Sequence, residues 1–164
     1  MTVRDSLRRY DANLIHLAPG DVLVRSKNEV IVAGILEQLV PGRWQYERPL
    51  RDSTGATKYP DFTVETLTGE QVIWEHLGLM HNPRYAREWE QKKQWYIAQG
   101  FRPYDDDSVP GPRGILMWTD DRHGVNEPDW HELAERVLGG GPAQPQRRVA
   151  KKAVPKRPQH RRAR

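Results

Sequence analysis

The chain has 164 residues, of which 37% are hydrophobic and 29% are charged. This length supplies one core of about 100–140 residues and leaves a remainder. No apolar run approaches the roughly 18 residues that a membrane-spanning helix needs, and the charged segment 1–11 lacks the apolar centre of a signal peptide. We therefore expect a cytoplasmic protein, free or nucleoid-associated, with no membrane partner. The absence of cysteine excludes disulfides and thiolate nucleophiles.

The net charge of +4 is distributed unevenly along the chain. Residues 142–164 hold nine of the 26 basic residues and no acidic one, so the remaining 17 basic residues stand against 22 acidic ones. We predict a folded domain over residues 1–139. We predict a basic, proline-rich, disordered tail over residues 140–164, because a segment without aromatic residues cannot bury enough apolar surface to offset its ordering entropy. Such a tail favours binding to nucleic acid or to an acidic protein.

The first half of the domain predicts one helix followed by three strands. Ser26 and Glu29 have the spacing of a capping box, and apolar residues then recur at helical spacing as far as Pro41. Alternating patterns bounded by turn residues predict strands at 44–50, 59–66 and 71–77. Three consecutive strands with short turns predict an antiparallel meander.

The second half predicts a helix from Pro83 to about Gln99, an apolar strand at 115–118 and a closing helix from Pro128 to Leu138. The fourth strand follows a crossover helix. The expected fold class is therefore α/β, a mixed four-stranded sheet flanked by helices on both faces.

Two acidic residues lie at informative places in this scheme. Asp61 is near the start of the second strand and Glu75 is near the end of the third. If these strands form a hairpin, both carboxylates reach one edge of the sheet. Two such carboxylates form a hard oxygen site that suits Mg²⁺ or Mn²⁺. A third acid, Glu29, lies one turn into the first helix and could reach the same site.

Four sequence blocks resemble the PD-(D/E)XK nuclease superfamily. Tyr59-Pro60-Asp61-Phe62 precedes Trp74-Glu75-His76, and the segments 25–29 and 89–96 flank them in the expected order. The resemblance covers about residues 24–120 and points to small standalone or helicase-associated nucleases. It implies an αβββαβ restriction-endonuclease-like core, and the order of elements expected above agrees with it.

The resemblance also implies roles for individual residues. Asp61 and Glu75 would ligate the metal, as would the backbone carbonyl of His76, and Glu29 would hold a metal-bound water or a second ion. The family pattern has a lysine where this chain has Leu77, so catalysis is lost or the cation has moved. The candidate is Lys92 on the next helix. Its spacing puts it on one helix face with Tyr85, Trp89 and Tyr96.

These observations predict a Mg²⁺- or Mn²⁺-dependent phosphodiesterase, an endonuclease-like hydrolase that acts on DNA. Arg25 and Lys27 would contact backbone phosphates. The tail would bind nucleic acid through basic residues that include Arg147, Arg148, Lys151 and Lys152. RNA as the substrate stays open. A homodimer also stays open, because cutting both strands often needs two active sites.

Two other classes of function compete with the enzyme. One is a catalytically inactive module of the same fold that binds nucleic acid or docks a partner, which the Leu77 departure favours. The other is an acidic protein-interaction domain that its tail neutralises. Individual residues also have plain structural interpretations: Glu29 completes a helix cap, Lys92 belongs to a solvated helix face, and three aromatic residues form core, namely Trp89, Trp95 and Tyr96.

Overall fold

The structure, a computed structural model, describes residues 13–139. Its centre is a five-stranded mixed sheet with the strand order β3-β6-β7-β9-β8. The strands are β3 Trp44–Tyr46, β6 Phe62–Glu65, β7 Gln71–Leu77, β8 Phe101–Pro103 and β9 Gly114–Asp120. β3, β6 and β7 pair antiparallel, whereas β7 and β8 each pair parallel with β9. The predicted tail lies outside the described residues, together with its four named basic residues.

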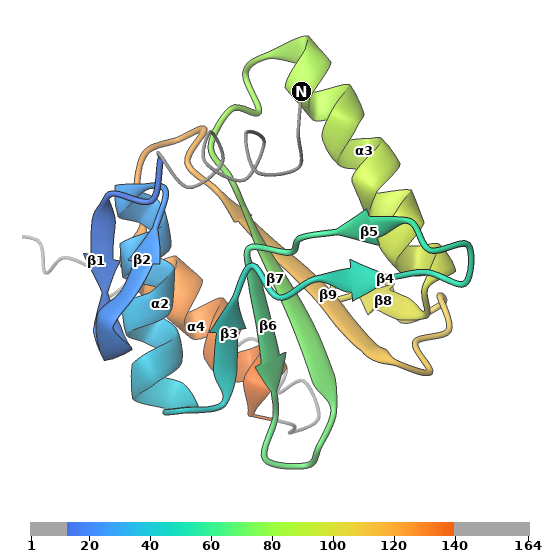
Figure 1. Cartoon of the computed structure of the whole chain (residues 1–164), viewed down its shortest axis with the longest axis horizontal. Coiled ribbons are helices and arrows are strands. Elements are labelled where there is room, and N and C mark those ends of the chain that lie inside the picture. Colours follow the sequence, from blue (N-terminus) through green and yellow to red (C-terminus); the bar gives the residue numbers. More distant parts are fainter. Residues whose placement is uncertain (1–12, 140–164) are drawn as a thin grey trace, which may run out of the picture.

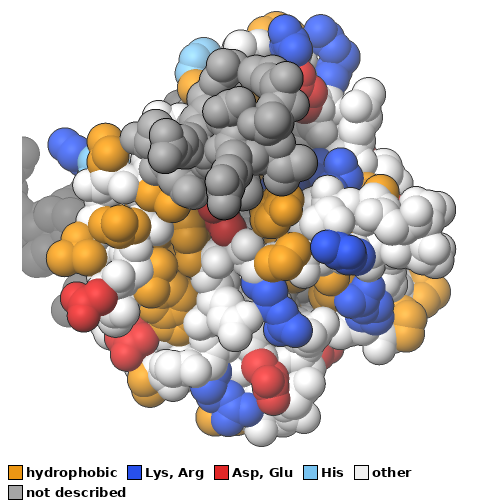
Figure 2. All heavy atoms as spheres, in the orientation of Figure 1, with side chains coloured by type: hydrophobic (Ala, Val, Ile, Leu, Met, Phe, Trp, Pro, Cys, Tyr) orange, Lys and Arg blue, Asp and Glu red, His pale blue; other side chains and the backbone are white. Residues whose placement is uncertain are grey.

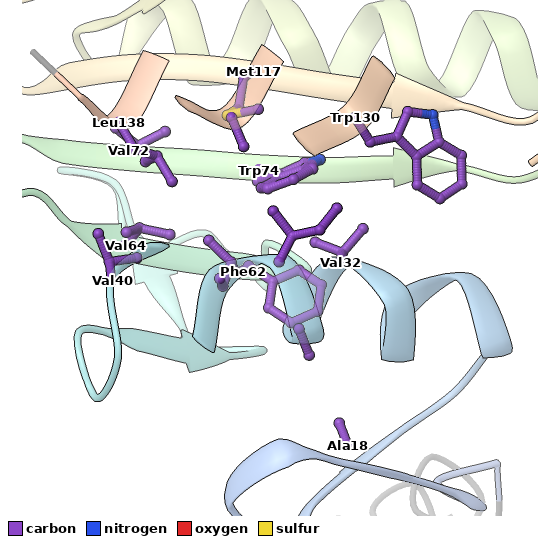
Figure 3. Packing of buried hydrophobic residues seen from close by; sticks show 14 of the residues in the cluster. Ala18, Val32, Val40, Phe62, Val64, Val72, Trp74, Met117, Trp130 and Leu138 are labelled. Atoms are coloured by element: carbon purple, nitrogen blue, oxygen red, sulfur yellow. The ribbon is translucent and has the colours of Figure 1, made fainter. Parts of the chain in front are cut away.

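Helices cover both faces of the sheet (Figure 1). α2, Lys27–Leu39, and α4, Glu127–Leu138, lie on one face, and α3, Pro83–Ala98, lies on the other. Alternation along β7 divides the core between these faces, because successive side chains of a strand point to opposite sides. Figure 3 shows Trp74 of β7 packed with Phe62 of β6 and Val32 of α2 on the first face. Ile73 packs instead with the residues of α3 on the second.

Two small hairpins complete the described fold. β1, His16–Ala18, pairs with β2, Val22–Val24, across the single 3-10 turn Pro19–Asp21. β4, Leu50–Arg51, pairs with β5, Thr57–Lys58. No helix among the described residues is long and apolar enough to cross a membrane.

The structure confirms the α/β class, the meander of β3, β6 and β7, and the parallel crossover to β9. The expected number of strands in the sheet was wrong, because the sheet has five strands rather than four. The missed strand is β8, a three-residue strand at the sheet edge that begins directly after Gly100. Three residues are too few to show the alternation of side chains that marks a strand. Pro103 also indicates a loop, because proline has no backbone N–H to donate to a neighbouring strand.

The expected single strand at 44–50 was also wrong. It breaks at Glu47, whose φ of 47° lies in the left-handed region that a non-glycine residue rarely adopts. The backbone N–H of Glu47 donates to the carbonyl of Asp61, 3.0 Å away. The chain therefore leaves the main sheet after β3 and forms the separate hairpin of β4 and β5. The next strand begins at Phe62, so Asp61 lies just before it.

Candidate functional site

Asp61 and Glu75 meet across the antiparallel pair of β6 and β7. Phe62 pairs with Trp74, so Asp61, one residue earlier, lies opposite Glu75. Oδ2 of Asp61 accepts a hydrogen bond from the backbone N–H of His76 at 2.8 Å. Glu75 is only 3% exposed, whereas Asp61 keeps some accessible surface. The hairpin expected from the sequence thus brings the two carboxylates together.

The pair carries negative charge that its surroundings do not fully neutralise. Burial raises the pKa of Asp61 well above its usual value, and the charge of Glu75 raises it further. The charge of Lys92 and the His76 N–H lower this pKa, but to a smaller extent. A buried carboxylate beside another carboxylate therefore favours a proton or a cation at this place.

Lys92 of α3 points to the carboxylates. Its Nζ lies 2.7 Å from Oε1 of Glu75, and 28% of the lysine side chain is exposed. Its neighbour Lys93 lies with its Nζ 4.5 Å from the centre of the Trp118 ring. Successive helix residues are rotated by about 100°, so only one of the two lysines can face Glu75. The lysine position expected from the helix face is the one that the structure places at the site.

Two tyrosines of α3 also belong to the site. The hydroxyl of Tyr96 donates to Oε1 of Glu75 at 2.5 Å, and burial together with the charge of Glu75 raises the pKa of Tyr96. Burial and then the charges of Asp61 and Glu75 raise the pKa of Tyr85 to about 12. The sequence predicts Tyr96 as a core residue. Its ring is indeed buried, but a buried tyrosine needs a partner for its hydroxyl, and that need was the missed signal.

Glu29 mainly closes the start of α2. Its Oε2 accepts hydrogen bonds from the backbone N–H groups of Arg25 and Ser26 at 2.8 and 3.2 Å, and from the hydroxyl of Tyr46 at 2.9 Å. The predicted capping box is confirmed. The charge of Glu29 raises the pKa of Asp61 only as the smallest of the contributing causes. One of the two carboxylate oxygens of Glu29 is therefore committed to the cap.

The two basic residues expected to contact phosphate differ in their surroundings. Nε and Nη2 of Arg25 bind both carboxylate oxygens of Glu47, at 2.7 and 3.1 Å, so a fixed acid already neutralises its charge. Lys27 is exposed at the first turn of α2. Of these two residues, Lys27 is the one whose charge remains open to a ligand from solvent.

The ring of His76 lies on the other face of the sheet from Glu75. Its Nδ1 is 3.0 Å from Oγ1 of Thr119, and its Nε2 is 3.1 Å from Nδ2 of Asn28. The same Nδ2 donates to the carboxylate of Asp121, which can only accept, so the amide group must donate to His76 as well. Nε2 is therefore unprotonated, in agreement with the lowering of the His76 pKa by burial. The ring is no part of the carboxylate site.

The donor set fits a hard divalent cation of the magnesium type. Within residues 13–139, no group of three or more histidine or carboxylate side chains is placed to hold a metal ion. Mg²⁺, however, usually keeps several waters and binds through one or two carboxylates and the phosphates of a substrate. Across the same residues, Oδ1 of Asp61 and Oε2 of Glu75 accept no hydrogen bond. Two carboxylate oxygens are therefore open to an ion.

In comparisons with protein-family models, curated proteins and solved structures, nothing matches this chain significantly.

Proposed function

We propose that the protein is a metal-dependent phosphodiesterase, an endonuclease-like enzyme that cuts DNA on a restriction-endonuclease-like core. One observation carries the proposal: Asp61 and Glu75 face each other across β6 and β7, with Nζ of Lys92 2.7 Å from Glu75. Two carboxylates and one cation in a partly open site are the groups that cleavage of a phosphodiester needs.

Asp61, Glu75 and the backbone carbonyl of His76 would hold Mg²⁺ or Mn²⁺. Such an ion, when bound, polarises a phosphate and lowers the pKa of a coordinated water. The raised pKa of Asp61 supports this assignment, because a divalent cation supplies the positive charge that the carboxylate pair lacks. The two unbonded oxygens described above supply the positions for it.

Lys92 would neutralise negative charge on the phosphate. Its stem runs from α3 and 28% of its side chain is exposed, so the residue that binds Glu75 is also within reach of a ligand from solvent. Tyr96 holds Oε1 of Glu75 from the same helix and fixes the orientation of this carboxylate. A preorganised cation of this kind would take the place of the lysine that the family pattern has where this chain has Leu77.

A second candidate function is a non-catalytic nucleic-acid-binding module. The observation that favours it is the saturation of Oε1 of Glu75, which both Lys92 and Tyr96 already bind. Two donors can satisfy a buried carboxylate oxygen without any metal ion. The two functions predict different effects of divalent ions: the enzyme should bind the ion and cut DNA, whereas the non-catalytic module should do neither.

The deciding experiment incubates the purified chain with supercoiled, linear and single-stranded DNA in Mg²⁺, Mn²⁺ or EDTA. We expect cleavage with either ion, none in EDTA, and none by Asp61→Asn or Glu75→Gln. Glu65→Gln is the matched control, because Glu65 lies at the exposed end of β6. Binding of DNA without cleavage under every condition would favour the non-catalytic module.

Metal binding has a readout that does not need activity. Titration of Mn²⁺ should raise the melting temperature of the natural chain and of Glu65→Gln, but not that of Asp61→Asn. An equal rise in all three proteins would place the ion elsewhere.

A further inference from the structure

A cavity lies on the same side of the sheet as the carboxylates. Its volume is about 320 Å³, and it lies between the segment 48–51 and the strands β6 and β7. Three arginines line it, Arg48, Arg51 and Arg113, and no acidic residue does. Figure 2 shows Lys and Arg side chains gathered over the hairpin of β4 and β5 and the strands beside it.

The positive charges of these three arginines lack an acidic partner among the described residues. None of them forms an ion pair with any other residue in the described range 13–139. The guanidinium of Arg113 lies 5.0 Å from the centre of the Phe101 ring, and such stacking holds the side chain without removing its charge. An anion that enters this cavity therefore meets uncompensated positive charge on several sides.

The neighbouring cavity provides a contrast. It is lined by Arg43, Arg48 and Glu65 among others. Arg43 is already used: it donates to the carbonyls of Glu65 and Thr66 and lies 3.6 Å from the Glu65 carboxylate. An arginine that tethers two strands is structural. Within the described residues, the side chains of the arginines in the 320 Å³ cavity form no comparable hydrogen bonds or ion pairs.

The cavity and the carboxylate pair lie along one face of β7. Gln71 and Ile73 line the cavity, and Glu75 follows them at the same alternation, so their side chains share one face. Glu75 follows Gln71 by four steps along the strand, which is a distance of about 13 Å at the usual rise per residue.

We infer that the cavity lined by Arg48, Arg51 and Arg113 binds a phosphate group of the nucleic acid that the carboxylate site acts on. This inference rests on the proposed function and adds to it the path of the substrate strand along β7. Guanidinium groups suit this role because their planar forks match phosphate oxygens two at a time. The phosphate is either an internal phosphodiester or the terminal group of a strand.

The test measures binding of a fluorescein-labelled oligonucleotide by anisotropy in EDTA, where no metal-dependent cleavage occurs. The variants are the double substitution Arg48→Gln with Arg51→Gln, and the single Arg113→Gln. The control is Arg87→Gln, an exposed arginine of α3 that does not line the cavity. We expect each lost arginine to weaken binding about three- to tenfold and to reduce the salt slope by about 0.7 on single strands or 0.9 on duplex, with the control unchanged.

Oligonucleotides with and without a terminal phosphate show whether the cavity binds an internal phosphodiester or the terminal phosphate of a strand. A loss confined to the phosphorylated strand assigns the cavity to a strand end, whereas an equal loss on both assigns it to an internal phosphate. Binding by both variants that equals that of Arg87→Gln overturns the inference.

The same proteins distinguish this inference from the proposed activity. If the arginine variants bind weakly and no form of the chain cleaves DNA with any metal, the phosphate site is upheld and the enzyme is rejected. If cleavage occurs and the arginine variants bind normally, the enzyme is upheld and the phosphate site is rejected.

Discussion

Nζ of Lys92 and Oε1 of Glu75 lie 2.7 Å apart, although one residue belongs to α3 and the other to β7. A lysine two residues after Glu75 on the strand itself would point to the same face, but this chain has Leu77 there, packed in the core below α3. The helix therefore supplies the cation that the strand lacks. This relationship makes Lys92 the residue that decides between an enzyme and an inactive module.

Substitution of Lys92 is the sharpest test of activity. Lys92→Ala should lower the single-turnover cleavage rate at least ~10²-fold, the scale for one preorganised charge-stabilising group. Lys93→Ala is the matched control and should cleave at nearly the natural rate, because Lys93 lies over the Trp118 ring. A near-normal rate for Lys92→Ala would show that its ammonium takes no part in the reaction.

Strong local signals made parts of the site predictable. The spacing of Ser26 and Glu29 fixed the start of α2, and the apolar run between two turns fixed the bounds of β7. Once β6 and β7 were expected to form a hairpin, the meeting of Asp61 and Glu75 followed from the pleat of the sheet alone.

The parts that could not be predicted depend on contacts between distant segments. The left-handed backbone of Glu47 is held by a hydrogen bond to Asp61, and no local pattern marks it. The hydroxyl of Tyr96 finds Glu75 only after α3 has packed on the sheet. The arginine cavity likewise forms from four segments that lie apart in the chain.

The raised pKa of Asp61 predicts a specific dependence of stability on pH. A carboxyl whose folded pKa lies above its usual value of 3.8 stabilises the fold when protonated, and this contribution is lost as the pH rises through the raised pKa. Asp61→Asn should therefore melt at a higher temperature than the natural chain at pH 7–8 in EDTA. Each kcal/mol gained corresponds to about 2–4 °C in a chain of this size.

The difference in melting temperature between the two proteins should shrink as the pH falls towards 4, because the natural chain then protonates Asp61. Glu65→Gln is again the control and should follow the natural chain at every pH. A melting temperature for Asp61→Asn that stays below the natural one at pH 8 would contradict the charge repulsion described for this site.

Gly114 begins β9 at a place where two backbones approach closely. Its φ is 150°, and a Cβ added there would lie 1.9 Å from the carbonyl oxygen of Gln71. Gly114→Ala must therefore separate β7 from β9, and we expect a loss of about 2–4 kcal/mol in the free energy of unfolding. The measurement is urea unfolding.

Gly69→Ala is the control that measures the cost of a positive φ without a steric clash. Gly69 also has a positive φ, 84°, but no atom lies within 4 Å of its added Cβ. This variant should lose only about 1 kcal/mol. Equal losses for the two variants would mean that the contact with Gln71 is relieved by a small movement of the chain.

Tyr96 is expected to act through Glu75 rather than on a substrate. Tyr96→Phe leaves the buried ring in place and removes the hydroxyl that binds Oε1 of Glu75 at 2.5 Å. Loss of a donor to a buried carboxylate should cost about 1–3 kcal/mol in the free energy of unfolding. It should also lower the cleavage rate about three- to tenfold, because Lys92 is then the one described side chain that still binds Glu75.

A purely structural tyrosine would change stability alone, so the variant needs a second readout. The affinity for Mn²⁺, measured by calorimetry, should fall in Tyr96→Phe because the carboxylate is no longer held in one orientation. Tyr104→Phe is the control, since the Tyr104 ring packs on Trp118 and, among the described residues, its hydroxyl forms no hydrogen bond to Glu75. An unchanged Mn²⁺ affinity together with a normal cleavage rate would limit Tyr96 to the stability of the core.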